Sequence, residues 1–233
     1  MNAQVLAGLA FRALGFDLSY PMRILFMLLV SLVAVSAAEP IKVACVGDSI
    51  TEGSGLQPDK RYPAQLQALL GAGYKVENFG VGGRTLLSKG NLPYIKEQRY
   101  QDALAMEPDI VVIMLGTNDA KPMNWKFEKE FEADYRALVD SFKKLKSKPR
   151  IFLCRILPGP NKPGPVDPAY ITEVNLRKLR PRIDKLGTTL GCKVIDMYAL
   201  FARHPELLPD GVHPNAAGAG ELAKAAAKAI QAK

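Results

Sequence analysis

Short apolar segments that alternate with amphipathic ones constrain the fold of this chain most strongly. The clearest segment is Ile110-Val-Val-Ile-Met-Leu115, whose uninterrupted apolar run is typical of a strand buried on both faces. The other segments with strand-like composition are 41–46, 75–79, 151–156 and 193–196. Helical periodicity is present at 62–70, 127–145 and from Asn215 onward. This alternation predicts an α/β protein with a five-stranded parallel sheet covered on both faces, in three α/β/α layers.

One further helix is expected between the fourth and fifth strands. Asp167 and Pro168 have the residue types of an N-cap and a first helical position. Pro181 lies later in the same segment, where it should kink or divide the helix.

The N-terminal 38 residues have the pattern of an export signal. Arg23 is followed by the uncharged segment 24–35 and by Ser36-Ala-Ala38, which places small residues at the −3 and −1 positions of a cleavage site. We predict a signal peptide cleaved after Ala38 and a secreted or periplasmic protein with no stable membrane anchor after cleavage. An uncleaved anchor is the alternative, although a span needs about 20 apolar residues. The segment 1–21 is either a long leader or lies upstream of a true start at Met22. Residues 39–233 are expected to form a single domain.

The charge and the cysteine content exclude several classes of protein. The net charge is +8, but the basic residues form no recognisable nucleic-acid motif, so no nucleic-acid partner is expected. Two histidines without a clustered ligand pattern predict neither a metal site nor another cofactor. Cys45, Cys154 and Cys192 lie in or beside predicted strands and fit small buried hydrophobic residues, although one disulfide remains open.

Four short motifs carry polar residues that suit chemistry, and three of them directly follow predicted strands. They are Gly47-Asp-Ser-Ile-Thr51, Asn78-Phe-Gly-Val-Gly-Gly-Arg84, Gly116-Thr-Asn-Asp119 and Asp210-Gly-Val-His-Pro214. Sites in parallel sheets form outside the carboxyl ends of strands. This set, in this order, resembles the SGNH-hydrolase superfamily, also called the GDSL esterases and lipases. The resemblance implies the SGNH-hydrolase fold with the flavodoxin-like strand order 2-1-3-4-5, and it implies hydrolysis of carboxylic esters.

A catalytic triad is expected from three of these residues. Ser49 lies at a strand-to-helix turn, where its hydroxyl can be exposed, but a serine needs an adjacent base to act as a nucleophile. The base must be His204 or His213, because the chain has no other histidine. We favour His213, since Asp210 three residues earlier can orient its ring. The alternatives are a serine that only caps a helix and a surface histidine.

The resemblance also implies an oxyanion hole. It assigns the donors to the Ser49 N–H, the Gly83 N–H and the Asn118 side-chain amide. Gly83 is preferred to Gly82 because it lies five residues after Asn78, as in the family pattern. Both glycines and Asn118 are also common turn residues.

Three residues beside these motifs are candidates for substrate binding. Asp48 adjoins the nucleophile, although holding the loop by hydrogen bonds is the favoured role for it. Arg84 could face an acidic or hydroxylated substrate or simply be solvated. Trp125 could stack on a sugar ring or pack as an apolar staple before the following helix, and we lean to the staple.

The predicted function is hydrolysis of short acyl esters, above all O-acetyl groups on carbohydrates. The segment 116–125 resembles a bacterial GDSL subgroup often associated with carbohydrate deacetylation, and no long apolar insertion offers room for a fatty chain. The expected partner is therefore a small-molecule or polysaccharide ester, while the oligomeric state stays open. The alternatives are a lysophospholipase, thioesterase or arylesterase of the same fold, or a non-catalytic carbohydrate-binding relative.

Overall fold

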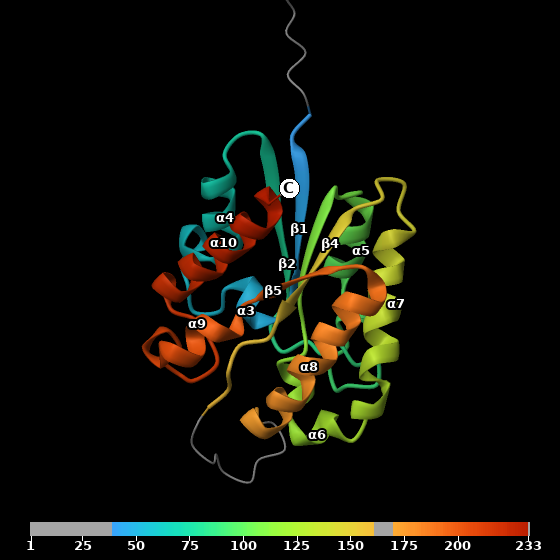
Figure 1. Ribbon diagram of the computed structural model, residues 1–233, viewed down its shortest axis with the longest axis vertical. Coiled ribbons are helices and arrows are strands. Elements are labelled where there is room, and N and C mark those ends of the chain that lie inside the picture. The colour runs from blue at the N-terminus through green and yellow to red at the C-terminus, as the bar shows by residue number, and fades with distance from the viewer. Residues whose placement is uncertain (1–38, 161–169, 233) are drawn as a thin grey trace, which may run out of the picture. The chain divides into compact units, whose positions relative to one another are not determined.

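Five parallel strands form one sheet in the computed structural model, in the order β2-β1-β3-β4-β5 (Figure 1). They are β1 (Ile41–Gly47), β2 (Tyr74–Gly80), β3 (Ile110–Met114), β4 (Arg150–Arg155) and β5 (Lys193–Asp196). The structure describes residues 39–160 and 170–232. The expected signal peptide, its cleavage after Ala38 and the helix start at Asp167-Pro168 lie outside these ranges. The predicted strand order and the parallel arrangement are confirmed.

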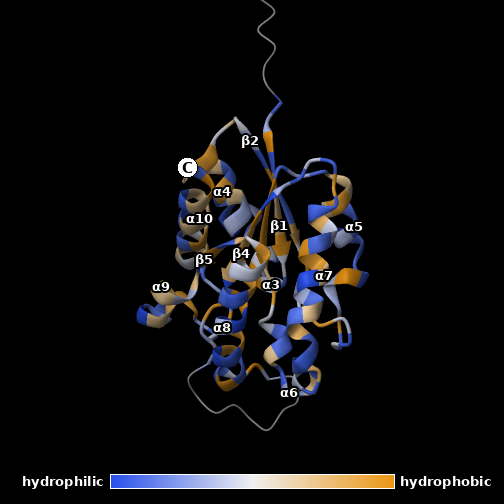
Figure 2. Cartoon of the chain, turned by 45° about the vertical axis from the view of Figure 1, so that its right-hand side comes forward, coloured by the Kyte–Doolittle hydropathy of each residue, from blue (hydrophilic) through white to orange (hydrophobic). Residues whose placement is uncertain are grey.

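Helices cover both faces of the sheet, as the three-layer prediction requires (Figure 1). One face carries α5 (Gln98–Ala105), α7 (Phe131–Lys143) and α8 (Glu173–Leu190). The other face carries α4 (Tyr62–Leu70), α9 (Tyr198–Arg203) and α10 (Ala216–Gln231). Strand β1 serves both faces, because Ala44 and Val46 pack into the first core while Val43 and Cys45 pack into the second. Hydrophobic residues therefore concentrate along the central strands, with polar stretches on the helices (Figure 2).

Short helices complete the described chain and lie mainly where strands leave the sheet. The α-helical ones are α3 (Ser49–Glu52) and α6 (Pro122–Trp125). The 3-10 turns are Pro58–Lys60, Tyr94–Lys96, Asn118–Ala120, Glu128–Glu130 and Pro205–Leu207.

Some helices differ from the expectation. Helix α8 begins after Thr172, whose hydroxyl accepts from the Asn175 N–H as an N-cap, and it runs through Pro181 undivided. Helix α7 begins only at Phe131, because Phe127 belongs to the preceding turn. The crossover helix α5 was not anticipated, since its sequence is strongly polar and buries only Ala103.

An ion pair between buried Arg180 and partly buried Glu173 holds the chain where β4 leaves the sheet. The guanidinium of Arg180 forms two hydrogen bonds with the Glu173 carboxylate, at 2.7 and 2.8 Å, and it also donates to the carbonyls of Ile156 and Leu157. Glu173 in turn accepts from the Gly159 N–H at 2.7 Å. Charge-assisted bonds of this kind fix the exit of β4 firmly, because breaking the pair would leave a buried charge uncompensated.

All three cysteines are buried free thiols, as the interpretation of them as small hydrophobic residues predicts. Burial raises the pKa of Cys45 to about 12. In the part of the chain that the structure describes, no helix is long and apolar enough to span a membrane. Within those same residues, no group of three or more His, Cys, Asp or Glu side chains could hold a metal ion.

Candidate active site

Ser49 is the first residue of α3, immediately after β1 has ended at Gly47. The turn is tight, since a Cβ on Gly47 would lie 2.0 Å from Oγ1 of Thr51 and 2.7 Å from the Met114 carbonyl oxygen. Asp48 caps the helix by accepting from the Ile50 N–H at 3.0 Å. The turn therefore presents the half-buried Ser49 side chain at the carboxyl edge of the sheet.

The C-terminal loop brings His213 to this serine. The Ser49 hydroxyl lies 2.8 Å from Nε2 of His213, and Nδ1 of His213 lies 2.7 Å from Oδ2 of Asp210. The other carboxylate oxygen of Asp210 accepts from the His213 and Val212 N–H groups at 2.7 and 2.9 Å. The three predicted triad residues thus form one hydrogen-bonded chain. Both oxygens of Asp210 are used to orient the loop and the imidazole ring.

The pKa of Asp210 is held below its ordinary value of 3.8. Partial burial opposes this shift, but hydrogen bonds from the His213 main chain and ring and from the Val212 N–H outweigh it. Asp210 is therefore a carboxylate at neutral pH, the state that stabilises an imidazolium on the neighbouring ring.

The other histidine lies apart on the surface. Nδ1 of His204 is 3.0 Å from Oε1 of Glu206, and the His204 side chain is half exposed. His204 therefore has a carboxylate partner that the sequence argument overlooked, but it is His213 that contacts Ser49.

The three expected oxyanion donors lie at the ends of β1, β2 and β3. The Ser49 N–H begins a helix, where main-chain N–H groups have no intrahelical acceptor. Gly83 has a φ of +78°, a conformation that favours glycine, and among the described residues its N–H has no hydrogen-bond acceptor. One amide hydrogen of Asn118 is used, because Nδ2 donates to the Arg84 carbonyl at 3.1 Å, and the second has no acceptor among the described residues.

Glycines allow α3 and the loop after β2 to approach closely. A Cβ on Gly80 would lie 2.1 Å from the Glu52 main-chain nitrogen, and one on Gly82 would lie 2.7 Å from Oε2 of Glu52. The same position on Gly82 is 3.8 Å from Cβ of Ser49. The loop that carries Gly83 therefore lies beside the serine.

Sequence reasoning missed the role of Asp119, which follows Asn118 and is fully buried. Its two carboxylate oxygens accept from the main-chain N–H groups of Leu86 and Leu87, at 3.0 and 2.7 Å. Burial raises the pKa of Asp119 to about 7, although both hydrogen bonds oppose the shift. Asp119 thus ties the loop after β2 to the loop after β3. Its position beside the predicted donor Asn118 was the available signal.

Asp48 is completely buried beneath the site. Burial raises its pKa to about 6, against the opposing effect of the Ile50 N–H bond. Because this side chain caps α3 and has no exposed surface, the structure places it behind Ser49 rather than at the site's surface.

Arg84 is engaged by the protein itself. Nη1 donates to the Gly82 carbonyl oxygen at 2.7 Å, and Nε donates to Oε1 of Glu97 at 2.9 Å. About a quarter of each of these two charged side chains is exposed. Arg84 therefore braces the loop after β2, a use that neither of the two sequence interpretations included.

Trp125 ends α6 and is partly buried against the core that α7 and α8 also form. The ammonium group of Lys178 lies 5.6 Å from the centre of the indole ring. These contacts fit the apolar staple better than an open stacking platform.

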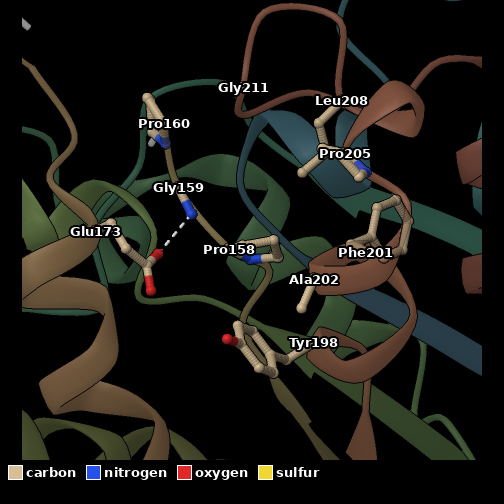
Figure 3. Close-up of a pocket in the computed structure, with 10 residues that line it drawn as sticks. All are labelled: Pro158, Gly159, Pro160, Glu173, Tyr198, Phe201, Ala202, Pro205, Leu208 and Gly211. Carbon is tan, nitrogen blue, oxygen red and sulfur yellow. Dashed lines mark hydrogen bonds between the residues drawn. The ribbon is translucent and has the colours of Figure 1, made fainter. Parts of the chain in front are cut away.

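A pocket of about 140 Å³ lies next to the loop of Asp210 and His213, between the end of β4 and α9 (Figure 3). Gly211 and Pro160 line it side by side, since a Cβ on Gly211 would lie 3.3 Å from Cα of Pro160, and the bond from Gly159 to Glu173 runs along one wall (Figure 3). Neither Ser49 nor His213 lines this pocket. The half-buried Ser49 therefore lies outside this pocket.

In this three-layer α/β/α fold, hydrogen bonds join a Ser, a His and an Asp at the carboxyl ends of the strands. This is the geometry of a serine hydrolase. Residues 45–220 match the family model described as the GDSL-like Lipase/Acylhydrolase family. The chain belongs to this family, and the resemblance to SGNH hydrolases is confirmed.

Several esterases are similar to this chain in sequence or in structure. The chain is 38% identical over 213 residues to an acetylxylan esterase of Xylanibacter ruminicola, a match that covers 83% of this chain and 44% of that protein. The chain thus spans less than half the length of this relative. A solved acetylxylan esterase from Geobacillus stearothermophilus, in a catalytic mutant form, is 26% identical with a TM-score of 0.61, covering 82% of this chain and 94% of that one. A putative arylesterase from Agrobacterium tumefaciens is 26% identical with a TM-score of 0.64, covering 82% and 98%.

Proposed function

We propose that this chain is a serine esterase that removes O-acetyl groups from carbohydrates, with residues 39–233 as its single catalytic domain. The observation that carries the proposal is the continuous hydrogen-bonded chain from Ser49 through His213 to Asp210. It supplies a nucleophile, a base and a group that orients the base, which is the minimum that serine acyl transfer needs.

In the first half of the reaction, Oγ of Ser49 attacks the ester carbonyl carbon while Nε2 of His213 accepts the hydroxyl proton. The carbonyl oxygen becomes an oxyanion that accepts from the Ser49 N–H, the Gly83 N–H and the Asn118 amide. The bond to the sugar oxygen then breaks, and protonated His213 gives its proton to that oxygen. The acetyl group is left on Ser49.

In the second half, a water molecule attacks the acetyl carbonyl carbon while His213 accepts a proton from it. The bond between the acetyl group and Ser49 breaks, acetate leaves, and His213 returns the proton to the serine hydroxyl. Asp210 remains ionised throughout and stabilises the imidazolium form of His213 in both halves.

The carbohydrate assignment is supported by the names of relatives rather than by a subsite. Two curated relatives are acetylxylan esterases, at 38% and 27% identity, and the second match covers 91% of that protein. Since the chain covers only 44% of the first relative, the substrate is proposed for the matched part alone. We also propose export through residues 1–38, because Arg23, the uncharged segment 24–35 and Ser36-Ala-Ala38 have the pattern of a cleaved signal peptide.

The test compares the purified chain with Ser49→Ala on acetylated xylan and on p-nitrophenyl acetate. We expect acetate release by the natural chain and almost none by the variant, with equal free energies of unfolding. A serine-reactive fluorophosphonate should label the natural chain only. Labelling without release of acetate from any carbohydrate would indicate an arylesterase, thioesterase or lysophospholipase instead. Absence of labelling would indicate a non-catalytic binding protein.

A further inference from the structure

The peptide unit between Gly82 and Gly83 is held from one side by a charged side chain. Nη1 of Arg84 donates to the Gly82 carbonyl oxygen at 2.7 Å, and the Glu97 carboxylate holds Nε of the same guanidinium at 2.9 Å. The Gly82 carbonyl and the Gly83 N–H belong to one planar unit, and the described residues contain no cis peptide bond. The N–H of Gly83 therefore points away from the guanidinium.

Apart from the guanidinium, a turn holds the ends of this segment, because the Arg84 N–H donates to the Val81 carbonyl at 3.4 Å. Both residues of the peptide unit are glycine, and Gly83 has a φ of +78°, so neither has a side chain that restricts rotation of the unit. Among the described residues, the Gly83 N–H has no hydrogen-bond acceptor of its own. Within this peptide unit, the Gly82 carbonyl is therefore the group that the protein holds by a hydrogen bond, and the Arg84 guanidinium is the donor.

We propose that Arg84, held by Glu97, is a positioning residue that orients the Gly83 N–H toward the oxyanion. The inference rests on the proposed esterase function for its effect on rate, but the orientation itself does not depend on it. The positive charge of the guanidinium beside the Gly82 carbonyl also polarises the peptide, which makes the Gly83 N–H a stronger donor. Arg84 does not touch the substrate in this arrangement.

Arg84 also contacts the Asn118 donor, through its main-chain carbonyl. The main-chain carbonyl of Arg84 accepts from Nδ2 of Asn118 at 3.1 Å. The guanidinium sets the Gly82–Gly83 peptide, and the carbonyl anchors the Asn118 amide, so both donors are fixed against one residue. Arg84→Met keeps the carbonyl and removes only the guanidinium, which isolates the proposed effect.

Steady-state kinetics on p-nitrophenyl acetate supply the first test. Arg84→Met should lower kcat by about 10- to 100-fold, less than the 10²–10³ lost with a whole donor, and should leave KM within about twofold. Arg84→Lys, which can still donate to the Gly82 carbonyl, should recover part of the loss. Arg99→Met is the matched control, because Arg99 is a nearby exposed arginine, and it should leave kcat unchanged. A kcat for Arg84→Met within about twofold of the natural value would overturn the proposal.

The second test observes the Gly83 amide group itself by NMR. In ¹⁵N-labelled protein, Arg84→Met should shift or broaden the Gly83 amide resonance, and Arg99→Met should not. An unchanged Gly83 resonance would overturn the proposal even if kcat fell. If the natural chain hydrolysed no ester at all, the proposed function would fail while this measurement still decided the orientation. If Arg84→Met does not fold, Glu97→Ala serves as the test: it removes the acceptor of Nε, so it should lower kcat and shift the Gly83 resonance, and no change in either would overturn the proposal.

Discussion

The Ser49 hydroxyl and Nε2 of His213 lie 2.8 Å apart, although 164 positions separate the two residues in the chain. Ser49 is held by the turn after β1, and His213 is held by a loop whose main chain is bound by Asp210. Two locally rigid segments thus meet at the carboxyl ends of the strands. That contact turns two ordinary polar residues into a possible nucleophile and base.

Removal of the Asn118 amide tests the third oxyanion donor. Asn118→Ala should lower kcat on the order of 10²–10³-fold, because the amide would stabilise charge that develops only in the transition state. Asn118→Asp keeps the shape but loses the donor and should be at least as slow. Steady-state kinetics on p-nitrophenyl acetate measure both variants. A loss of tenfold or less would mean that the two main-chain donors suffice.

Activity should rise with pH if His213 is the base. Only neutral imidazole can accept the Ser49 proton, so kcat should be lower in acid than at neutral pH. Asp210, whose pKa is held below 3.8, stays ionised and adds no second limb near neutrality. The profile of kcat from about pH 5 to 8 checks this expectation. His204→Asn is the control and should leave the profile unchanged, and a flat profile would exclude His213 as the base.

The contribution of Asp48 to the free energy of unfolding should change with pH in the opposite direction to that of a surface carboxylate. Burial raises the pKa of Asp48 from 3.8 to about 6, so between these values the folded chain binds more protons than the unfolded chain. The free energy of unfolding that Asp48 contributes therefore falls as pH rises through this window and is level above it.

Asp48→Asn removes this titration and keeps an oxygen that can accept from Ile50. Urea unfolding of both proteins at about pH 4.5 and 7.5 should show the natural chain losing stability relative to the variant at the higher pH. Asp59→Asn is the control, because the exposed Asp59 has a pKa lowered by Lys60 and should show no such loss. A relative gain by the natural chain at pH 7.5 would contradict the prediction.

Acyl chains longer than butyryl should be poor substrates. Leu92 lies against the expected oxyanion loop, since its Cδ1 is 3.5 Å from the position of a Cβ on Gly83, and its side chain is 42% exposed. An enzyme with a deep apolar tunnel would gain about 0.8 kcal/mol per buried methylene. We expect kcat/KM for acetyl to decanoyl p-nitrophenyl esters to decline beyond butyryl. A maximum at octanoyl or longer would defeat the acetylesterase proposal.

Local patterns predicted most of the elements but not all of their limits. The helix 62–70 and the strand 193–196 appear with the expected bounds, because each has its own periodicity and its own stop signals. Helix α5 was missed because its sequence is polar and the helix buries only Ala103, so the apolar periodicity that predicts a helix is weak. Pro181 does not divide α8, where packing outweighs the local preference.

What the sequence by itself determined is the alternation of strands and helices, the order of the motifs and the identities of the polar residues that follow the strands. These features depend on period, composition and turn chemistry, which act over a few neighbouring residues. Only the tertiary structure decided which atoms meet: His213 rather than His204 on Ser49, Asp119 on the Leu86 and Leu87 N–H groups, and Arg84 on the Gly82 carbonyl. The reason is physical, since side chains such as arginine are long and can reach several acceptors, and burial selects among them by the cost of leaving a polar group unpaired.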